Sequence, residues 1–126
     1  MSARSKSFSS FAEAVRDIPD GATIGFGGFA VAGMPINLYG ALARQGAKEL
    51  TCVSNSTRGG ATLPADAPDM GQMIKNGQVK KVVCAFTAPT RASQRLILSE
   101  YVDKGLIEAE LVPQGTLAER MRAAGV

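Results

Sequence analysis

Residues 21–43 form the longest uncharged segment of the chain, and this segment limits the possible folds more than any other feature. It contains six glycines together with Pro35 and Asn37. A membrane-spanning helix needs about 20 consecutive apolar residues and seldom carries so many helix breakers. The apolar pattern also changes halfway, from a continuous run to helical spacing after Pro35. The segment therefore predicts a buried strand, a glycine-rich loop and a helix.

Apolar runs and amphipathic stretches alternate along the whole chain. Strands are expected at residues 22–26, 49–55, 79–86 and 107–113, and helices at 8–15, 35–46, 70–76, 90–104 and 116–124. This alternation is typical of an α/β domain with a mainly parallel sheet. We expect a single domain over 1–126, with three layers and helices on both faces of the sheet. Another strand would normally follow the last helix, so the fold is expected to be truncated at its C-terminus.

Capping residues support several of these helix boundaries. Ser9 or Ser10 can cap the first helix, Gly46 can end the second, and Thr116 with Glu119 forms a capping box for the last. Phe8, Phe11, Ala12 and Val15 fall on one face of the first helix, which is expected to be buried.

Composition excludes several classes of function. The net charge is +3, but the basic residues are scattered and no aromatic residues interleave with them, so nucleic-acid binding is not expected. There is no histidine, and Cys52 and Cys84 form no metal-binding motif, so no metal site is predicted. The N-terminus lacks the apolar core of a secretory signal. We expect two buried thiols and a cytoplasmic protein without membrane contact.

The glycine-rich loop "GFGGFAVAGMP" at residues 25–35 has two interpretations. Gly25, Gly27 and Ala30 fit the dinucleotide-binding pattern G-x-G-x-x-A. That pattern requires the helix to open inside the motif and an acidic residue to end the second strand. Here the helix is expected only from Pro35, and the second strand ends in Ser54-Asn55-Ser56. A Rossmann-type dinucleotide-binding module stays an alternative.

The other interpretation uses more of the sequence. The segments "IPDGATIGFGGFAVAGMPINL", "ELTCVSN" and "PQGTLAERMRAAG" occur in this order, and the loop carries the pattern G-G-F-x-x-x-G-x-P at Gly27, Gly28, Phe29, Gly33 and Pro35. The chain thereby closely resembles the N-terminal portion of the α subunit of family I coenzyme A transferases, such as the 3-oxoacid and 3-oxoadipate enzymes. The resemblance covers nearly all of the chain.

The resemblance implies covalent catalysis by a glutamate, with coenzyme A as substrate and no cofactor. In the family, the glutamate attacks an acyl-CoA, and a glutamyl-CoA thioester forms through a mixed anhydride. Gln114 of "PQG" corresponds to the side chain that contacts the oxyanion or substrate. Asn55 and Ser56 correspond to the substrate site, although the family often has a second asparagine at position 56. The loop residues Gly27, Gly28, Phe29 and Gly33 would approach the acyl group or the partner subunit.

The resemblance also implies a partner. The family's nucleophile lies in a Glu-Asn-Gly context in the β subunit, and none of the six glutamates here is followed by Asn-Gly. We therefore expect a hetero-oligomer of this chain with a CoA-transferase β subunit. The complex is expected to act on acyl-CoA and small carboxylic acids, and this chain is expected to be inactive without its partner. Residues 56–93 are longer than in the oxoacid members, so no acid pair is assigned.

Structural roles remain open for the same residues. Gln114 could satisfy backbone groups in a turn, Asn55 could form an Asx turn, and Gly33 with Pro35 could only end the strand and begin the helix. Arg91 and Arg95 lie one helical turn apart and could meet a CoA phosphate or simply face solvent. A truncated α/β protein without catalysis is the third alternative.

Overall fold

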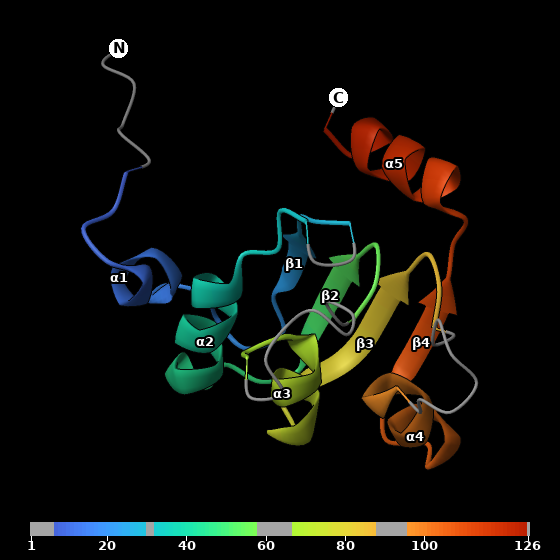
Figure 1. Ribbon diagram of the computed structural model, residues 1–126, viewed down its shortest axis with the longest axis horizontal. Coiled ribbons are helices and arrows are strands. Elements are labelled where there is room, and N and C mark those ends of the chain that lie inside the picture. Colours follow the sequence, from blue (N-terminus) through green and yellow to red (C-terminus); the bar gives the residue numbers. More distant parts are fainter. Residues whose placement is uncertain (1–6, 30–31, 58–66, 88–95, 126) are drawn as a thin grey trace.

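The computed structural model describes residues 7–29, 32–57, 67–87 and 96–125, and its centre is a four-stranded parallel sheet (Figure 1). The strands are β1 (Thr23–Phe26), β2 (Leu50–Ser54), β3 (Val79–Cys84) and β4 (Glu108–Leu111), in the spatial order β1-β2-β3-β4. The helices are α1 (Phe11–Val15), α2 (Ile36–Gln45), α3 (Met70–Lys75), α4 (Ile97–Asp103) and α5 (Gln114–Ala123). The expected α/β fold with a parallel sheet is confirmed.

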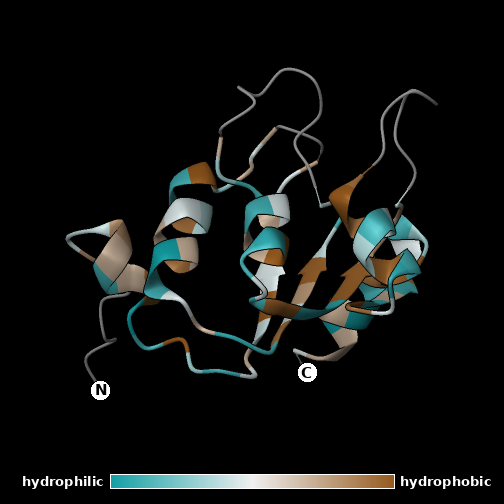
Figure 2. Cartoon of the chain, turned by 90° about the horizontal axis from the view of Figure 1, so that it is seen from below, coloured by the Kyte–Doolittle hydropathy of each residue, from teal (hydrophilic) through white to brown (hydrophobic). Residues whose placement is uncertain are grey.

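The helices that connect the strands lie on one face of this sheet. Figures 1 and 2 show α2, α3 and α4 side by side on the same side of the strands. Right-handed crossovers between strands in sequential order place every connecting helix on the same face. Within the described residues, the other face carries only α5, near the carboxyl ends of the strands. The helices on both faces that the sequence suggested are thus distributed very unequally.

The core lies between the sheet and the helix layer. In β2, Leu50, Cys52 and Ser54 are buried while Thr51 and Val53 are half-buried, as expected for a strand with one covered face. The helices contribute further large buried side chains, which are Tyr39, Leu42, Met70, Met73, Ile74 and Leu98.

The helix ends follow some of the sequence signals and depart from others. Ser10 caps α1 and Gly46 ends α2 at φ 87°, as predicted. Pro35 is the N-cap of α2 rather than its first residue. The capping box predicted at Thr116 is wrong, because α5 already begins at Gln114 and its N-cap Pro113 makes no side-chain hydrogen bond.

The first helix is also less buried than its apolar pattern predicts. Only Val15 is buried in α1, whereas Phe8 and Phe11 are 55% and 52% exposed. Phe8 precedes the five-residue helix and therefore cannot share its packing face. Residues 90–95 of the predicted fourth helix, Arg91 and Arg95 among them, lie outside the described residues. None of the helices described here is long and apolar enough to cross a membrane.

Both cysteines are buried and unpaired within the described chain, as predicted. Burial raises the pKa of the Cys52 thiol to about 12 and raises the pKa of Cys84 as well. Burial likewise raises the pKa of the Tyr39 hydroxyl. The folded chain therefore favours the neutral form of each group.

These raised pKa values predict a loss of stability at alkaline pH. An unfolded thiol ionises near pH 9, whereas folded Cys52 stays protonated until about pH 12. Its contribution is complete below pH 9 and is lost as pH rises toward 12, by about 1 kcal/mol per pH unit. Urea unfolding at pH 8, 9 and 10 measures this slope. Cys52→Ala should flatten it between pH 9 and 10, before Tyr39 contributes, and an unchanged slope would contradict the assignment.

Candidate functional site

A cavity of about 260 Å³ lies at the carboxyl ends of β1 and β2, beneath α5. Ligands of parallel α/β proteins usually bind at this edge of the sheet, where loops from different strands meet. The lining residues are Phe26, Gly27, Gly28, Phe29, Val53, Ser54, Asn55, Gln114, Leu117, Ala118 and Met121. The fold thus brings Gly27, Gly28, Phe29, Asn55 and Gln114, all predicted site residues, around one cavity.

The glycine-rich loop folds back on itself beside this cavity. Phe29 and Ala32 exchange two backbone hydrogen bonds, of 2.9 and 3.0 Å, which close a narrow turn. Gly28 has φ 116°, and a Cβ there would lie 3.2 Å from the Ala32 oxygen and from the Met34 nitrogen. The loop therefore needs glycine at position 28 for its own close packing.

Gly33 is part of the same turn but not of the cavity wall. Its φ is 74°, and a Cβ at this position would lie 3.7 Å from the Gly28 Cα. Gly33 packs against Gly28 and is not among the residues that line the cavity. Its position therefore does not support its predicted role as a substrate contact. Ala30, the third residue of the dinucleotide pattern, lies outside the described residues.

Asn55 follows β2 and is one of the residues that line the cavity. Its backbone oxygen accepts a 3.0 Å hydrogen bond from the Ala85 nitrogen, which ties it to the segment after β3. Its Oδ1 atom is buried and accepts no hydrogen bond from the described part of the chain. The alternative of an Asx turn needs this oxygen as an acceptor, so that structural role is not seen.

Ser54 and Ser56 hold the backbone on either side of Asn55. The Ser54 Oγ donates a 2.5 Å hydrogen bond to the Ser56 oxygen. Ser56 itself does not line the cavity. Its backbone helps to fix the turn that carries Asn55, and its role as a substrate-binding residue stays a prediction.

Gln114 is the first residue of α5 and lines the same cavity as the glycine loop. Its side chain is exposed and makes no hydrogen bond within the described residues, so it does not serve the turn as the structural alternative supposed. Because Pro113 supplies no capping side chain, the N–H groups of the first turn are also available. This end of the helix is favourable for negative charge.

The apolar wall of the cavity is the part that the sequence pattern did not identify. Phe26 stacks on the buried Tyr39 ring, with centroids 4.5 Å apart and planes 5° from parallel. Val53 comes from β2, and Leu117, Ala118 and Met121 from one side of α5. These residues look like ordinary core residues in the sequence, because only the crossing of α5 over the strand ends shows that they face a cavity.

No charged side chain is among the described residues that line the cavity. The described residues also contain no group of three or more side chains that could hold a metal ion. The chemical character of the site is therefore apolar, with two carboxamides and nearby backbone N–H groups.

The dinucleotide-binding alternative does not fit this geometry. The helix after the glycine loop begins at Ile36, well beyond the glycines, and the end of β2 carries no acid. The four strands also run in sequential order, so the described sheet lacks the reversal at which dinucleotides bind.

Comparison with known proteins supports the other interpretation. Residues 8–126 match the family model of coenzyme A transferase. The chain is 42% identical over 120 residues to the α subunit of 3-oxoadipate CoA-transferase from Pseudomonas putida, in a match that covers 95% of this chain and 48% of the relative. It is 38% identical over 113 residues to the mitochondrial succinyl-CoA:3-ketoacid coenzyme A transferase 2A of Rattus norvegicus. This match covers 90% of the present chain and 20% of the relative.

A solved structure shares the fold. A variant of the decarboxylase AibA/AibB matches with a TM-score of 0.70 and 28% identity, over 91% of this chain and 42% of that one. The chain spans about half the length of the α subunits that it matches, 48% in P. putida and 46% in Bacillus subtilis. Since the family match covers nearly the whole chain and the predicted motif residues surround its cavity, this protein belongs to the coenzyme A transferase family.

Proposed function

We propose that the chain forms the acyl-binding part of a CoA-transferase α subunit, in an enzyme that moves CoA between an acyl-CoA and a free 3-oxo carboxylic acid. One observation carries the proposal: two carboxamides, from Asn55 and Gln114, meet a close-packed glycine loop at one apolar cavity. The Asn55 Oδ1 is buried without a hydrogen-bond partner in the described chain, and the Gln114 side chain is exposed.

In the proposed reaction, a glutamate carboxylate from the β subunit attacks the thioester carbonyl. The carbonyl electron pair moves to oxygen, and the oxyanion collapses with expulsion of the CoA thiolate to give a mixed anhydride. The thiolate then attacks the glutamyl carbonyl of that anhydride and releases the first acid as its carboxylate. A second acid reverses these steps on the glutamyl-CoA thioester.

Gln114 would donate a hydrogen bond from its Nε2 to the oxyanion at each tetrahedral stage. A carboxamide suits this task because it donates without titrating. Asn55 would orient the acyl group from the opposite wall, and the apolar side chains between them would hold the acyl chain and exclude water. Asn55 and Gln114 thus have distinct tasks, positioning and charge stabilisation.

The surroundings of the glutamates support a nucleophile from another chain. All six lie within the described residues and none lines the cavity. Each one is engaged elsewhere: Glu13 with Ser9, Glu49 with Lys80, Glu100 with Lys104, Glu108 and Glu110 with Lys81, and Glu119 with Arg122. We infer a hetero-oligomer with a β subunit, no cofactor beyond CoA as substrate, and a cytoplasmic location.

The proposal predicts that activity depends on a partner. The chain alone should not transfer CoA from succinyl-CoA to acetoacetate or 3-oxoadipate. Joined to the remaining half of the P. putida α subunit and mixed with that enzyme's β subunit, it should transfer CoA. The assay follows acyl-CoA by absorbance, with the P. putida enzyme as positive control. Transfer by the chain alone, or none by the joined chain in a folded complex, would contradict the proposal.

A further inference from the structure

Helix α5 carries Gln114, yet it is weakly anchored to the rest of the molecule. Leu117 is its only buried residue, and Met121 on the same side is 54% exposed. Just before the helix, the Val112 nitrogen donates a 2.9 Å hydrogen bond to the Cys84 oxygen. One buried side chain and one backbone hydrogen bond constrain the rotation of α5 about its axis only weakly, so a further contact can set its orientation.

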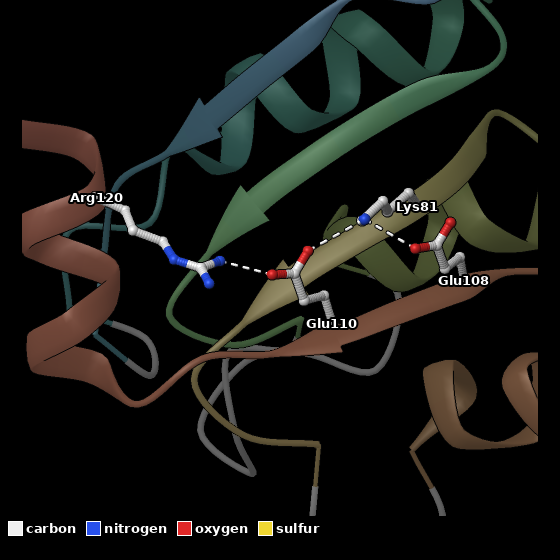
Figure 3. Close-up of polar contacts among 4 residues, drawn as sticks. All are labelled: Lys81, Glu108, Glu110 and Arg120. Atoms are coloured by element: carbon white, nitrogen blue, oxygen red, sulfur yellow. Dashed lines mark hydrogen bonds and ion pairs between the residues drawn. The ribbon is translucent and has the colours of Figure 1, made fainter. Parts of the chain in front are cut away.

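That contact belongs to a row of side chains with alternating charge, Glu108, Lys81, Glu110 and Arg120 (Figure 3). The row lies on the face of the sheet that the connecting helices leave uncovered. Lys81 Nζ on β3 lies 2.8 Å from Glu108 Oε1 and 3.1 Å from Glu110 Oε2, both on β4. The other oxygen of Glu110, Oε1, lies 2.6 Å from Arg120 Nη1 on α5. Glu110 thus uses both oxygens, one to join the sheet and one to join the helix.

Lys81 sets the orientation of the Glu110 carboxylate. Its side chain is only 27% exposed, so it is the most enclosed member of the row. By holding Glu110 Oε2 it leaves Oε1 turned toward α5, as Figure 3 shows. Hydrogen bonds from Arg120 and then Lys81 lower the pKa of Glu110, so its carboxyl stays ionised at neutral pH.

The spacing of residues along α5 links the Glu110–Arg120 contact to the orientation of Gln114. Successive residues in a helix are rotated by about 100°, so Gln114, Leu117 and Arg120 step around one side, each about 60° from the last. Leu117 fixes one point of the helix against the cavity wall. Arg120 fixes a second point beside it, and two points determine the roll that directs Gln114.

We propose that Glu110 and Arg120 are positioning residues, which hold α5 so that Gln114 faces the cavity, with Lys81 setting the carboxylate of Glu110. The task assigned to Gln114 rests on the proposed function, whereas the attachment of α5 does not. A single exposed ion pair stabilises a fold little. The effect is therefore expected in the local order of α5 and in the chemical step rather than in global stability.

Hydrogen–deuterium exchange of the full chain tests the attachment without any assay of activity. Arg120→Gln should speed exchange of the amides at 117–123 about fivefold, while β2 and β3 keep their rates. Arg122→Gln is the matched control, because it removes the Glu119 pair of 3.3 Å on the same helix and leaves Glu110 bound. Equal exchange of α5 in the two variants would overturn the proposal.

The active complex tests the consequence for catalysis. Arg120→Gln should lower kcat about tenfold with KM within twofold, Arg120→Lys should recover most of it, and Arg122→Gln should change neither. Loss of melting temperature in proportion to activity would mean a merely structural role and would overturn the proposal. A folded but inactive wild-type complex would count against the proposed function alone. The hydrogen–deuterium exchange experiment would still test whether Arg120 holds α5 in place.

Discussion

Replacing Gln114 with alanine is expected to lower kcat for CoA transfer by about 10²- to 10³-fold in the complex with the β subunit. Loss of one oxyanion donor has an effect of this size in other acyl-transfer enzymes, about 2.7–4 kcal/mol. KM should change little, because the lost bond strengthens only as charge develops on the oxygen. Stability should be unaffected, since the exposed Gln114 side chain makes no hydrogen bond in the described residues.

Two further variants make this result specific. Gln114→Asn keeps the carboxamide but shortens its reach, so a partial loss of kcat is expected. Thr116→Ala lies two residues further along α5, outside the cavity wall, and should be neutral. If Gln114→Ala kept full activity, the oxyanion would have to be stabilised from elsewhere.

Gly28→Ala is expected to destabilise the chain by about 2–4 kcal/mol. The new Cβ would lie 3.2 Å from Ala32 O, Met34 N and Met34 Cγ, and two of these three atoms belong to the backbone. The φ of 116° adds strain for any residue with a side chain. The two costs, steric and conformational, are each about 1–3 kcal/mol, and relaxation of the loop offsets part of their sum.

The adjacent glycine provides the control. Among the described residues, a Cβ at Gly27 would meet only the Gly33 oxygen, at 4.0 Å, and the φ of Gly27 is not in the region that favours glycine. Gly27→Ala should therefore shift the urea midpoint by less than a quarter of the shift for Gly28→Ala. Similar midpoints for both variants would show that the turn is softer than its geometry indicates.

The element order was predictable because the signals are local. The strand of residues 22–26, the loop and the helix after Pro35 each follow from apolar spacing and from glycine or proline at the ends. The same local reasoning failed where burial is decided by distant contacts. Phe8 and Phe11 have the spacing of a buried face, but no neighbouring element covers them within the described chain.

The candidate site was predictable only in its polar and glycine residues. Gly27, Gly28, Asn55 and Gln114 belong to recognisable motifs, whereas Val53 and Met121 are indistinguishable from core residues until α5 is placed over the strand ends. Glu110 and Arg120 show the same limit, since nothing in their spacing indicates that one carboxylate joins two elements. Their importance comes from the three-dimensional arrangement.

The fold by itself does not determine the chemistry performed at this edge of the sheet. One solved structure that matches this chain is that of a decarboxylase, which shares the architecture with a TM-score of 0.70. Functions differ among proteins of one fold through the side chains placed in the site. For this chain the experiments on Gln114 and Arg120 are therefore more informative than any further comparison of architecture.

The sequential strand order also affects how the molecule is made. Each strand pairs only with the strand before it and the strand after it in the chain. During synthesis β1, α2 and β2 emerge from the ribosome before β3 is made. Each new strand can therefore pair with a strand that has already emerged. Residues that pair across neighbouring strands, such as Thr23 with Thr51 and Lys81 with Glu108, are closer in the chain than pairing between non-consecutive strands would require. This strand order therefore lowers the contact order of the sheet, which favours faster folding than other orders of the same strands. The sheet can therefore grow in the direction of synthesis, and Gln114 joins Asn55 only as the last described helix emerges.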